Sequence, residues 1–384
     1  MRHIWSWVPA LKPVPPAEIF CLERTGQPIA NVVNWSGVKP RCIRPAACER
    51  VITVPVEQRF TVSNSSAGTA SDLWTRTRIS VRAAIAMARP YFLLGTIPLY
   101  LVGALGAARD PRALAVVPFF IGLAVVLSIQ LQTHFYNEYH DRETDRTAAS
   151  SLLTGGSGAL VKYDLYDEFA LWLGRAAVLL ALGLTGVLAM VAFRPLLLGV
   201  VFLAIALGWA YSSPPARFVA RGLGELTVVV LAGVLVPLFG FLLQGGTATQ
   251  DILPILGTLV PLTFGMNIAT TLPDIDGDRR TGKRTLAVRL GARRVVDIGF
   301  VAFLLGCAVG VWTLEQLLPG AGMIGLAVAA VICLVGVSPV AGARSGDQQA
   351  ASRMAVIVTA AYGTIVSGLS LVIVAGAWAI SLPW

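Results

Sequence analysis

The chain has 384 residues, of which 55% are hydrophobic and only 13% are charged, and its mean hydropathy is +0.72. This balance excludes an ordinary water-soluble globule, whose surface must be largely polar, and indicates a chain that is solvated by a lipid bilayer. The formal net charge of +9 does not indicate a nucleic-acid partner, because the basic residues fall in short loops between apolar runs rather than in a stripe with interleaved aromatic residues.

Residues 1–82 differ from the rest of the chain. They are rich in Pro, Ser, Asn and Arg and contain no apolar stretch long enough to cross a bilayer. Without a sustained hydrophobic period, this composition predicts a disordered or loosely folded extension. It also lacks the uninterrupted apolar segment of a secretory signal. A transmembrane domain is therefore predicted at residues 83–384.

Apolar runs of membrane-spanning length recur from about residue 91 to the end of the chain. They predict an all-α membrane protein with about nine transmembrane helices, at roughly 91–108, 113–136, 176–193, 195–211, 225–244, 252–272, 296–317, 321–341 and 354–381. The loops on one side carry most of the Lys and Arg residues, whereas the other side keeps only Arg109, Arg112 and Arg194. By the positive-inside rule we expect a plasma-membrane protein with its N-terminus in the cytoplasm.

Oxygen-bearing side chains recur at intervals of four at two predicted helix ends. The second span runs into Asn137, Asp141 and Asp145, and the sixth span ends in Asp274 and Asp278. On a helix this spacing places the side chains on one face. Carboxylates stacked beside a membrane need a compensating cation, and Mg²⁺ binds one or two carboxylates together with substrate phosphates. Two such clusters facing one cavity could hold a diphosphate and stabilise its departure.

Two alternatives remain open at this point. Each cluster could be a solvated helix end whose acids pair with the adjacent Arg142, Arg146, Arg279 and Arg280; the matched spacing and the shared side favour the metal interpretation. A transporter with a cation pathway belongs to a different class of protein. It would place acids near mid-span, whereas these acids lie at helix ends beside arginines.

The motifs together resemble the paired signatures of the UbiA superfamily of intramembrane prenyltransferases. The similarity covers about residues 85–384 and includes Arg89-Pro90, the segment from Tyr211 to Arg217, Arg221 to Glu225, and Asp278 to Gly291. The resemblance implies helices around a central cavity that opens laterally to lipid. It also implies Mg²⁺-dependent transfer of a polyprenyl group from polyprenyl diphosphate to a lipid-soluble, aromatic acceptor.

The resemblance assigns roles to particular residues. Those that resemble ligands of magnesium and diphosphate are Asn137, Asp141, Asp145, Asp274 and Asp278. Those that resemble other substrate contacts are Arg89 at the diphosphate and Tyr211 and Ser212 beside the reaction centre. Lys283 fits as a further phosphate contact, because an ammonium group offers a compact charge to an anion.

A glycine-rich segment, Thr154 to Gly158, lies beside the first cluster and is followed by Lys162. Such a backbone can bend closely around an anion, so Lys162 is a further candidate for substrate binding; the segment could equally be a linker. Taken alone, Arg89 could anchor a helix at the interface, Tyr211 could belong to an aromatic belt, and Lys283 could be one more cytoplasmic charge. We interpret His134 and His140 as packed or interfacial residues.

The acceptor is the least determined part of the prediction. The glycine-rich segment and the stretch Gly282 to Gly291 resemble the 1,4-dihydroxy-2-naphthoate branch, which feeds menaquinone synthesis. Leu272-Pro273 departs from the Asn-x-x-Arg approach that is frequent in that branch. Acceptors such as 4-hydroxybenzoate, homogentisate, haem, chlorophyllide or sugar phosphate therefore stay open. An inactive scaffold is disfavoured because no expected acid is missing.

The resemblance begins near Met87, so we expect translation of the natural protein to start downstream of residue 1. A native peptide from residues 1–60, detected by mass spectrometry, would contradict this expectation.

Overall fold

The computed structural model describes strands at 18–22, 28–33 and 50–54, and otherwise residues 70–108, 113–145, 157–163, 165–166, 168–191, 195–247, 249–317, 320, 325, 328 and 339–380. The chain divides into two compact units, Met1–Trp74 and Thr75–Trp384. In the first unit, β1 (Glu18–Leu22) pairs antiparallel with β2 (Pro28–Val33) on one side and with β3 (Arg50–Val54) on the other. Helix α1 (Ala70–Ala88) runs across the boundary predicted at residues 82 and 83.

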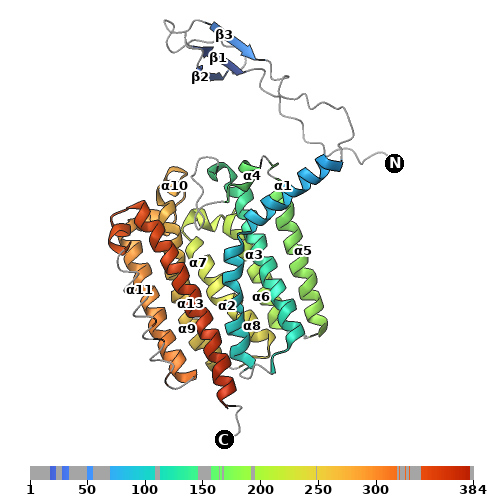
Figure 1. Ribbon diagram of the computed structural model, residues 1–384, viewed down its shortest axis with the longest axis vertical. Helices are drawn as coiled ribbons and strands as arrows, with labels where there is room; N and C mark the ends of the chain where they lie inside the picture. The colour runs from blue at the N-terminus through green and yellow to red at the C-terminus, as the bar shows by residue number, and fades with distance from the viewer. Residues whose placement is uncertain are drawn as a thin grey trace. The chain divides into compact units, whose positions relative to one another are not determined.

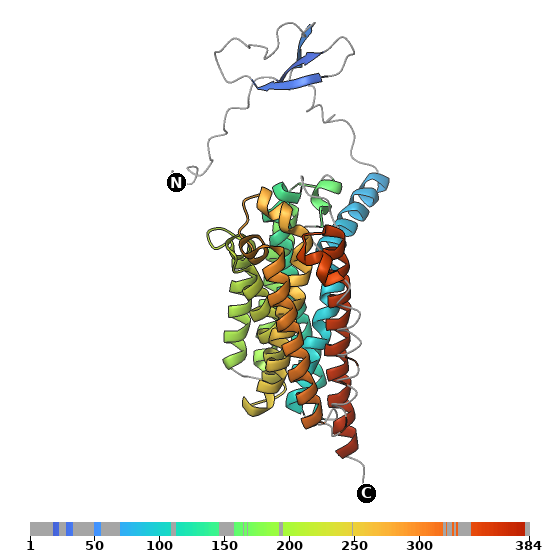
Figure 2. The same cartoon turned by 90° about the vertical axis from the view of Figure 1, so that its left-hand side faces the viewer.

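The second unit is a bundle of long helices that run side by side (Figures 1 and 2). Its elements, in chain order after α1, are α2 (Pro90–Ala108), α3 (Val116–Asp145), α4 (Ala159–Lys162), α5 (Glu168–Val191), α6 (Pro195–Ser212), η4 (Phe218–Arg221), α7 (Gly224–Val228), the π-helical turn η5 (Val229–Leu235), α8 (Val236–Leu243), α9 (Thr249–Thr271), η6 (Leu272–Asp274), α10 (Ile275–Arg280), α11 (Leu286–Leu317) and α13 (Gln348–Ile380). The short elements α4 and α10 lie at the same end of the bundle (Figure 1).

Within the described residues, eight helices are long and apolar enough to cross a membrane. They are Pro90–Ala108, Val116–Arg142, Glu168–Val191, Pro195–Ser212, Gly224–Leu243, Gln250–Arg280, Leu286–Gln316 and Gln348–Ala375. These eight correspond to all the predicted spans except 321–341, which lies almost wholly outside the described residues. The predicted all-α membrane fold is confirmed.

Glycines let neighbouring helices approach backbone to backbone. A Cβ atom added at Gly103 on α2 would lie 1.9 Å from the carbonyl oxygen of Pro237, and one at Gly240 on α8 would lie 2.6 Å from that of Tyr100. On α9, a Cβ at Gly265 would lie 2.7 Å from the carbonyl oxygen of Gly299 on α11. Small residues at such crossings are typical of membrane helices, where close packing replaces the hydrophobic effect as the force between helices.

Buried hydroxyl groups add direct bonds between helices. Thr263 Oγ1 on α9 lies 2.9 Å from the Tyr362 hydroxyl on α13, and Thr258 Oγ1 lies 3.2 Å from Thr313 Oγ1 on α11. Helix α9 is thus fixed against α11 and α13. Because α9 continues into η6 and α10, this packing determines where Asp274 and Asp278 lie.

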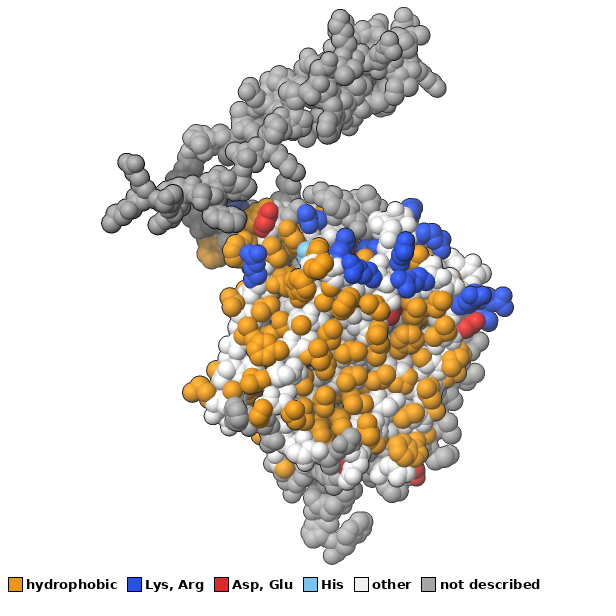
Figure 3. Space-filling view, turned by 180° about the vertical axis from the view of Figure 1, so that it is seen from behind, with side chains coloured by type: hydrophobic (Ala, Val, Ile, Leu, Met, Phe, Trp, Pro, Cys, Tyr) orange, Lys and Arg blue, Asp and Glu red, His pale blue; other side chains and the backbone are white. Residues whose placement is uncertain are grey.

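The surface of the bundle has the polarity expected of a lipid-embedded protein. A broad hydrophobic band covers the middle, and Lys and Arg gather at one end, the end that carries α4 and α10 (Figures 1 and 3). Large apolar side chains such as Leu179, Met190 and Leu371 are exposed, as expected where lipid rather than water is the solvent. The protein is therefore a multi-pass membrane protein. Arg109, Arg112 and Arg194, predicted for the opposite side, lie outside the described residues.

Candidate active site

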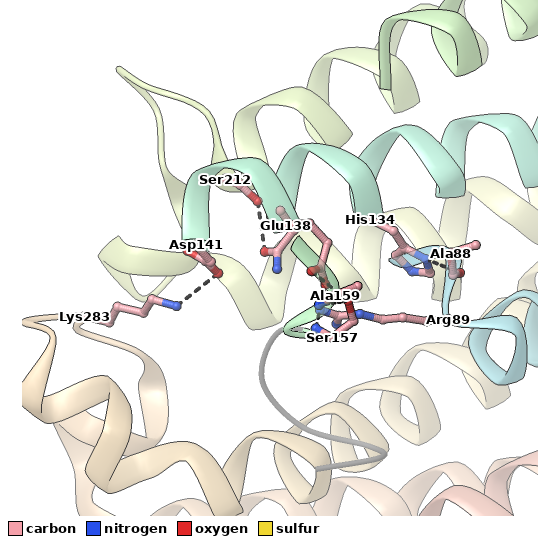
Figure 4. Close-up of polar contacts among 10 residues, drawn as sticks. Ala88, Arg89, His134, Glu138, Asp141, Ser157, Ala159, Ser212 and Lys283 are labelled. Carbon is pink, nitrogen blue, oxygen red and sulfur yellow. Dashed lines mark hydrogen bonds and ion pairs between the residues drawn. The ribbon is translucent and has the colours of Figure 1, made fainter. Parts of the chain in front are cut away.

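The two acidic helix ends meet at Lys283. Its ammonium nitrogen lies 3.1 Å from Asp141 Oδ2 on α3 and 3.9 Å from Asp278 Oδ1 on α10, and Figure 4 shows the contact with Asp141. All three side chains are largely buried. One lysine can contact both carboxylates only if the two helix ends face a common region.

Asp274 belongs to the same group of charges. It ends η6, and Asp278 follows four residues later in α10, so both lie at the end of the sixth predicted span. The carboxylate of Asp278 interacts electrostatically with those of Asp274 and Asp141. Asp141, Asp274 and Asp278 therefore lie in one region with Lys283. Asp145 is the last residue of α3; its side chain lies outside the described residues.

The arginines that adjoin the acidic motifs have partners of their own. Arg279 forms an ion pair of 3.4 Å with Asp276, and Arg280 donates a hydrogen bond of 3.2 Å to the Asp276 carbonyl oxygen. Arg142 donates a 2.6 Å hydrogen bond to the Tyr139 carbonyl oxygen. The ion pair between Arg279 and Asp276 is a contact of the kind that the solvated-helix-end interpretation predicts, and Arg146 lies outside the described residues.

Asn137 on α3 is joined to the C-terminal end of α6. The Ser212 hydroxyl donates a 3.0 Å hydrogen bond to Asn137 Oδ1. The preceding residue, Tyr211, is buried within range of the charges of Asp141, Glu225, Arg89 and Asp278. The structure thus brings together most of the predicted site: Asn137, Asp141, Tyr211, Ser212, Asp274, Asp278, Lys283 and Arg89.

Arg89 lies at the junction of α1 and α2, where a positive φ of 50° turns the chain. Its guanidinium donates a 2.8 Å hydrogen bond to Glu138 Oε1. The Glu138 side chain is only 1% exposed, and it also accepts hydrogen bonds from the backbone N–H (2.7 Å) and the hydroxyl (2.8 Å) of Ser157. Figure 4 shows Glu138 between Arg89 and Ser157.

The role of Glu138 was not predicted, because Glu138 does not follow the spacing of four that marks the acids. Glu138 also lies just beyond the predicted span at 113–136, whereas in the structure the span continues to Arg142, so the rule that an acid within a membrane helix requires a buried partner did not single it out. Ser157 in turn accepts a 3.1 Å hydrogen bond from the Ala159 N–H at the start of α4. Glu138 therefore joins α3, the α1–α2 junction and the start of α4.

Glu225 is a second buried acid that sequence reasoning did not single out. Its Oε1 accepts a 2.8 Å hydrogen bond from the Leu286 N–H at the start of α11. Nearby, the Arg284 N–H donates to the Ala220 carbonyl oxygen (2.9 Å) and the Arg289 guanidinium to that of Arg221 (2.6 Å). These bonds fasten the segment that carries Lys283 to the loop after α6.

Lys162 and the two histidines occupy other positions. Lys162 is exposed on α4, with its ammonium 5.5 Å from the centre of the Tyr163 ring, and among the described residues it has no ion pair with the acids around Lys283. His134 Nδ1 lies 2.8 Å from the Ala88 carbonyl oxygen, and His140 packs edge-on against Tyr139. Both histidines therefore have local packing partners.

The donor set fits magnesium shared with a substrate. Carboxylate and amide oxygens are the hard ligands that Mg²⁺ prefers. Within the part of the chain that the structure describes, no three acidic, histidine or cysteine side chains are grouped so that they could hold an ion alone. In proteins Mg²⁺ usually completes its coordination with water and with phosphate oxygens of the substrate.

Fold and site together define a polytopic membrane protein with an acidic cluster at one end of its helix bundle. Comparison with protein families gives a more specific result: the UbiA prenyltransferase family matches residues 96–357. The chain belongs to this family. The match begins inside α2, so α1 and the unit before it lie outside the matched region.

Three curated proteins illustrate the similarity. The 1,4-dihydroxy-2-naphthoate octaprenyltransferase of Bacillus subtilis is 25% identical over 203 residues, which are 53% of this chain and 63% of that protein. The enzyme of the same name from Mycobacterium tuberculosis is 29% identical over 266 residues (68% and 87%). The homogentisate phytyltransferase of Synechocystis sp. is 30% identical over 260 residues (62% and 79%).

Solved structures confirm the fold. A UbiA homolog from Archaeoglobus fulgidus bound to DMAPP and Mg²⁺ has a TM-score of 0.55 at 16% identity, covering 74% of this chain and 99% of that one. The apo structure of a UbiA homolog from Aeropyrum pernix has a TM-score of 0.52 at 19% identity, with coverages of 76% and 98%.

Proposed function

We propose that this chain is a Mg²⁺-dependent prenyltransferase that moves a polyprenyl group from polyprenyl diphosphate to a lipid-soluble aromatic acceptor and releases diphosphate. The observation that carries the proposal is the meeting of Asp141 and Asp278, from two distant helix ends, at Lys283. Carboxylates that converge beside an ammonium group suit a polyanion that arrives with divalent ions.

The residues divide into two groups. Those that would hold Mg²⁺ are Asn137, Asp141, Asp145, Asp274 and Asp278. Those that would contact the substrate are Arg89, Lys162, Tyr211, Ser212 and Lys283. When bound, Mg²⁺ supplies positive charge that stabilises the departing diphosphate. Lys283 adds a compact charge at the same place, and the apolar helix walls exclude water from the allylic carbon.

For the acceptor we propose a 1,4-dihydroxy-2-naphthoate-like compound, which would place the protein in quinone biosynthesis. Relatives named for that acceptor from Bacillus subtilis, Haemophilus influenzae and Mycobacterium tuberculosis support this choice. The similarity to a homogentisate phytyltransferase keeps homogentisate as the alternative. For localisation we propose the plasma membrane, with the basic end of the bundle and the N-terminus in the cytoplasm.

Membranes that contain the full chain, incubated with radiolabelled prenyl diphosphate and a panel of aromatic acceptors, test the proposal. We expect prenylated product with the naphthoate only when Mg²⁺ is present, and none from the double variant Asp141→Ala/Asp274→Ala. Asp276→Ala is the matched control, because Asp276 lies two residues after Asp274 but is exposed and pairs with Arg279; it should retain activity.

Three other results of this assay would contradict parts of the proposal. Product that persists in the double variant would refute the site assignment, and product only with another acceptor would refute the naphthoate. Absence of product with every acceptor would overturn the enzyme proposal in favour of the transporter alternative.

A further inference from the structure

Helix α1 has one face that packs against the bundle. Ala83 and Met87 are fully buried in a cluster with Phe135 on α3, Leu160 on α4 and Ala170 on α5. Because Ala83 and Met87 are four residues apart, they lie on the same side of the helix. The C-terminal half of α1 is therefore anchored to the membrane domain, although it precedes the region that matches the family.

The opposite face of α1 is apolar and exposed. Trp74, Val81 and Ile85 are 75%, 52% and 56% exposed. Their intervals of seven and four place them in one stripe along a helix, on the side away from Ala83 and Met87. Exposed apolar side chains are costly in water. This stripe needs an apolar neighbour that the bundle itself does not provide.

Arginines accompany the stripe. Arg78 lies between Trp74 and Val81 on the same side of the helix, and Arg82 is exposed beside Val81. Arg76 is also exposed, whereas α1 contains one acidic residue, Asp72. A helix that combines an apolar stripe carrying a tryptophan with a surplus of arginines has the composition of segments that lie in the membrane interface.

The position of α1 fits this composition. Helix α1 leads through Arg89 into α2, the first membrane span. Figures 1 and 2 show it slanting outward from the end of the bundle that carries α4 and α10, and Figure 3 shows the Lys and Arg side chains gathered at that end. Helix α1 therefore adjoins the end of the bundle at which Lys and Arg gather.

We infer that α1 is an interfacial helix that binds the anionic phospholipids of the leaflet at the basic end. Trp74, Val81 and Ile85 insert between headgroups and acyl chains, while Arg78 and Arg82 contact lipid phosphates. Each arginine near an anionic membrane surface favours the inserted state about fivefold. The inference rests on the membrane fold and the geometry of α1, and it is independent of the acceptor and of catalysis.

Site-directed spin labelling of the full chain tests this placement. A nitroxide is attached at Ile85→Cys, and separately at Val81→Cys, after replacement of the five native cysteines. Collision with oxygen, which dissolves in lipid, is compared with collision with a water-soluble nickel complex. Nanodiscs of phosphatidylcholine, alone or with phosphatidylglycerol, provide the membranes. Leu371→Cys, on the exposed side of α13, supplies the lipid-facing reference.

We expect both labels to collide more often with oxygen than with the nickel complex, and this preference should be stronger in the anionic discs. Both labels should lie at a shallower depth in the membrane than the label at 371. In the anionic discs, the double variant Arg78→Gln/Arg82→Gln should lower the equilibrium constant for insertion of the helix roughly 25-fold. The label at 85 should report this change as a shift toward water. Arg293→Gln/Arg294→Gln removes the same charge from two exposed positions on α11 and should have no effect.

Labels that favour the nickel complex in both kinds of disc would overturn the inference. So would labels that neither reagent reaches, because a protein segment would then cover the stripe. Equal insertion in the two kinds of disc would refute the preference for anionic lipid.

Discussion

Lys283 is the residue on which the site converges, since it contacts Asp141 and Asp278 together. We predict that Lys283→Met raises the KM for prenyl diphosphate by about tenfold or more, because a charge-assisted contact in a mostly buried site contributes about 1.5–3 kcal/mol. Arg284→Met removes an exposed charge from the next position and is the control. An unchanged KM in Lys283→Met would exclude a substrate role for the lysine.

The direction in which KM changes when Glu138 is substituted distinguishes two roles for this residue. Glu138→Gln removes a negative charge, so electrostatics alone would tighten the binding of a diphosphate. If Glu138 instead positions Arg89 and Ser157, its loss releases both groups, and the KM for prenyl diphosphate should rise about tenfold. Steady-state kinetics measure this change in KM. Glu138→Asp, which keeps the charge, should show a smaller rise in KM than Glu138→Gln. A lowered KM in Glu138→Gln would contradict the positioning role.

The sequence allowed the residues of the site to be predicted where their signal was local. Asp141, Asp274 and Asp278 stand out because a spacing of four is visible along the chain. Glu138 and Glu225 were missed because their partners, Arg89 and the Leu286 N–H, are remote in sequence. Lys162 was predicted from its position beside a glycine-rich segment, and its role in substrate binding stays a prediction.

At the scale of helices, the crossing of α9 and α11 holds η6 and α10 in place. A Cβ atom at Gly299 would lie 2.7 Å from Cγ2 of Ile268. We predict that Gly299→Val destabilises the protein by about 1–3 kcal/mol, since an overpacked helix contact must separate. Thermal unfolding in detergent measures the change. Gly363→Ala, at a position with no neighbouring atom within 4 Å, should leave the midpoint unchanged or raise it slightly.

Hydropathy located the spans well but placed some of their ends too early or too late. The predicted span at 113–136 continues as helix to Asp145, and the one at 296–317 begins at Leu286. Both additions are polar turns that extend beyond the hydrocarbon layer, where a hydropathy criterion no longer follows the helix. In α11 the added part includes a kink at Gly291, with φ of 79°, that no apolar period indicates.

For the whole molecule, composition was sufficient to predict an all-α membrane protein, because few soluble folds tolerate so apolar a chain. The bounds of the N-terminal part were harder to predict. Residues 1–82 were predicted to be one polar extension, and α1 crosses from that segment into the predicted transmembrane domain, where Ala83 and Met87 pack on the bundle. An amphipathic interfacial helix has too little net hydrophobicity to stand out in a search for spans.

The proposed activity requires the acids of α3 and α10 to bind one ligand together. Binding of a non-reactive prenyl thiodiphosphate to the purified protein, measured with and without Mg²⁺ for wild type, Asp141→Asn, Asp278→Asn and the double variant, tests this most directly. We predict that each single variant loses most of the Mg²⁺-dependent affinity and that the double variant loses little more, because both residues act on the same ions. Losses that simply add, or Mg²⁺-dependent binding that survives in the double variant, would contradict a shared site.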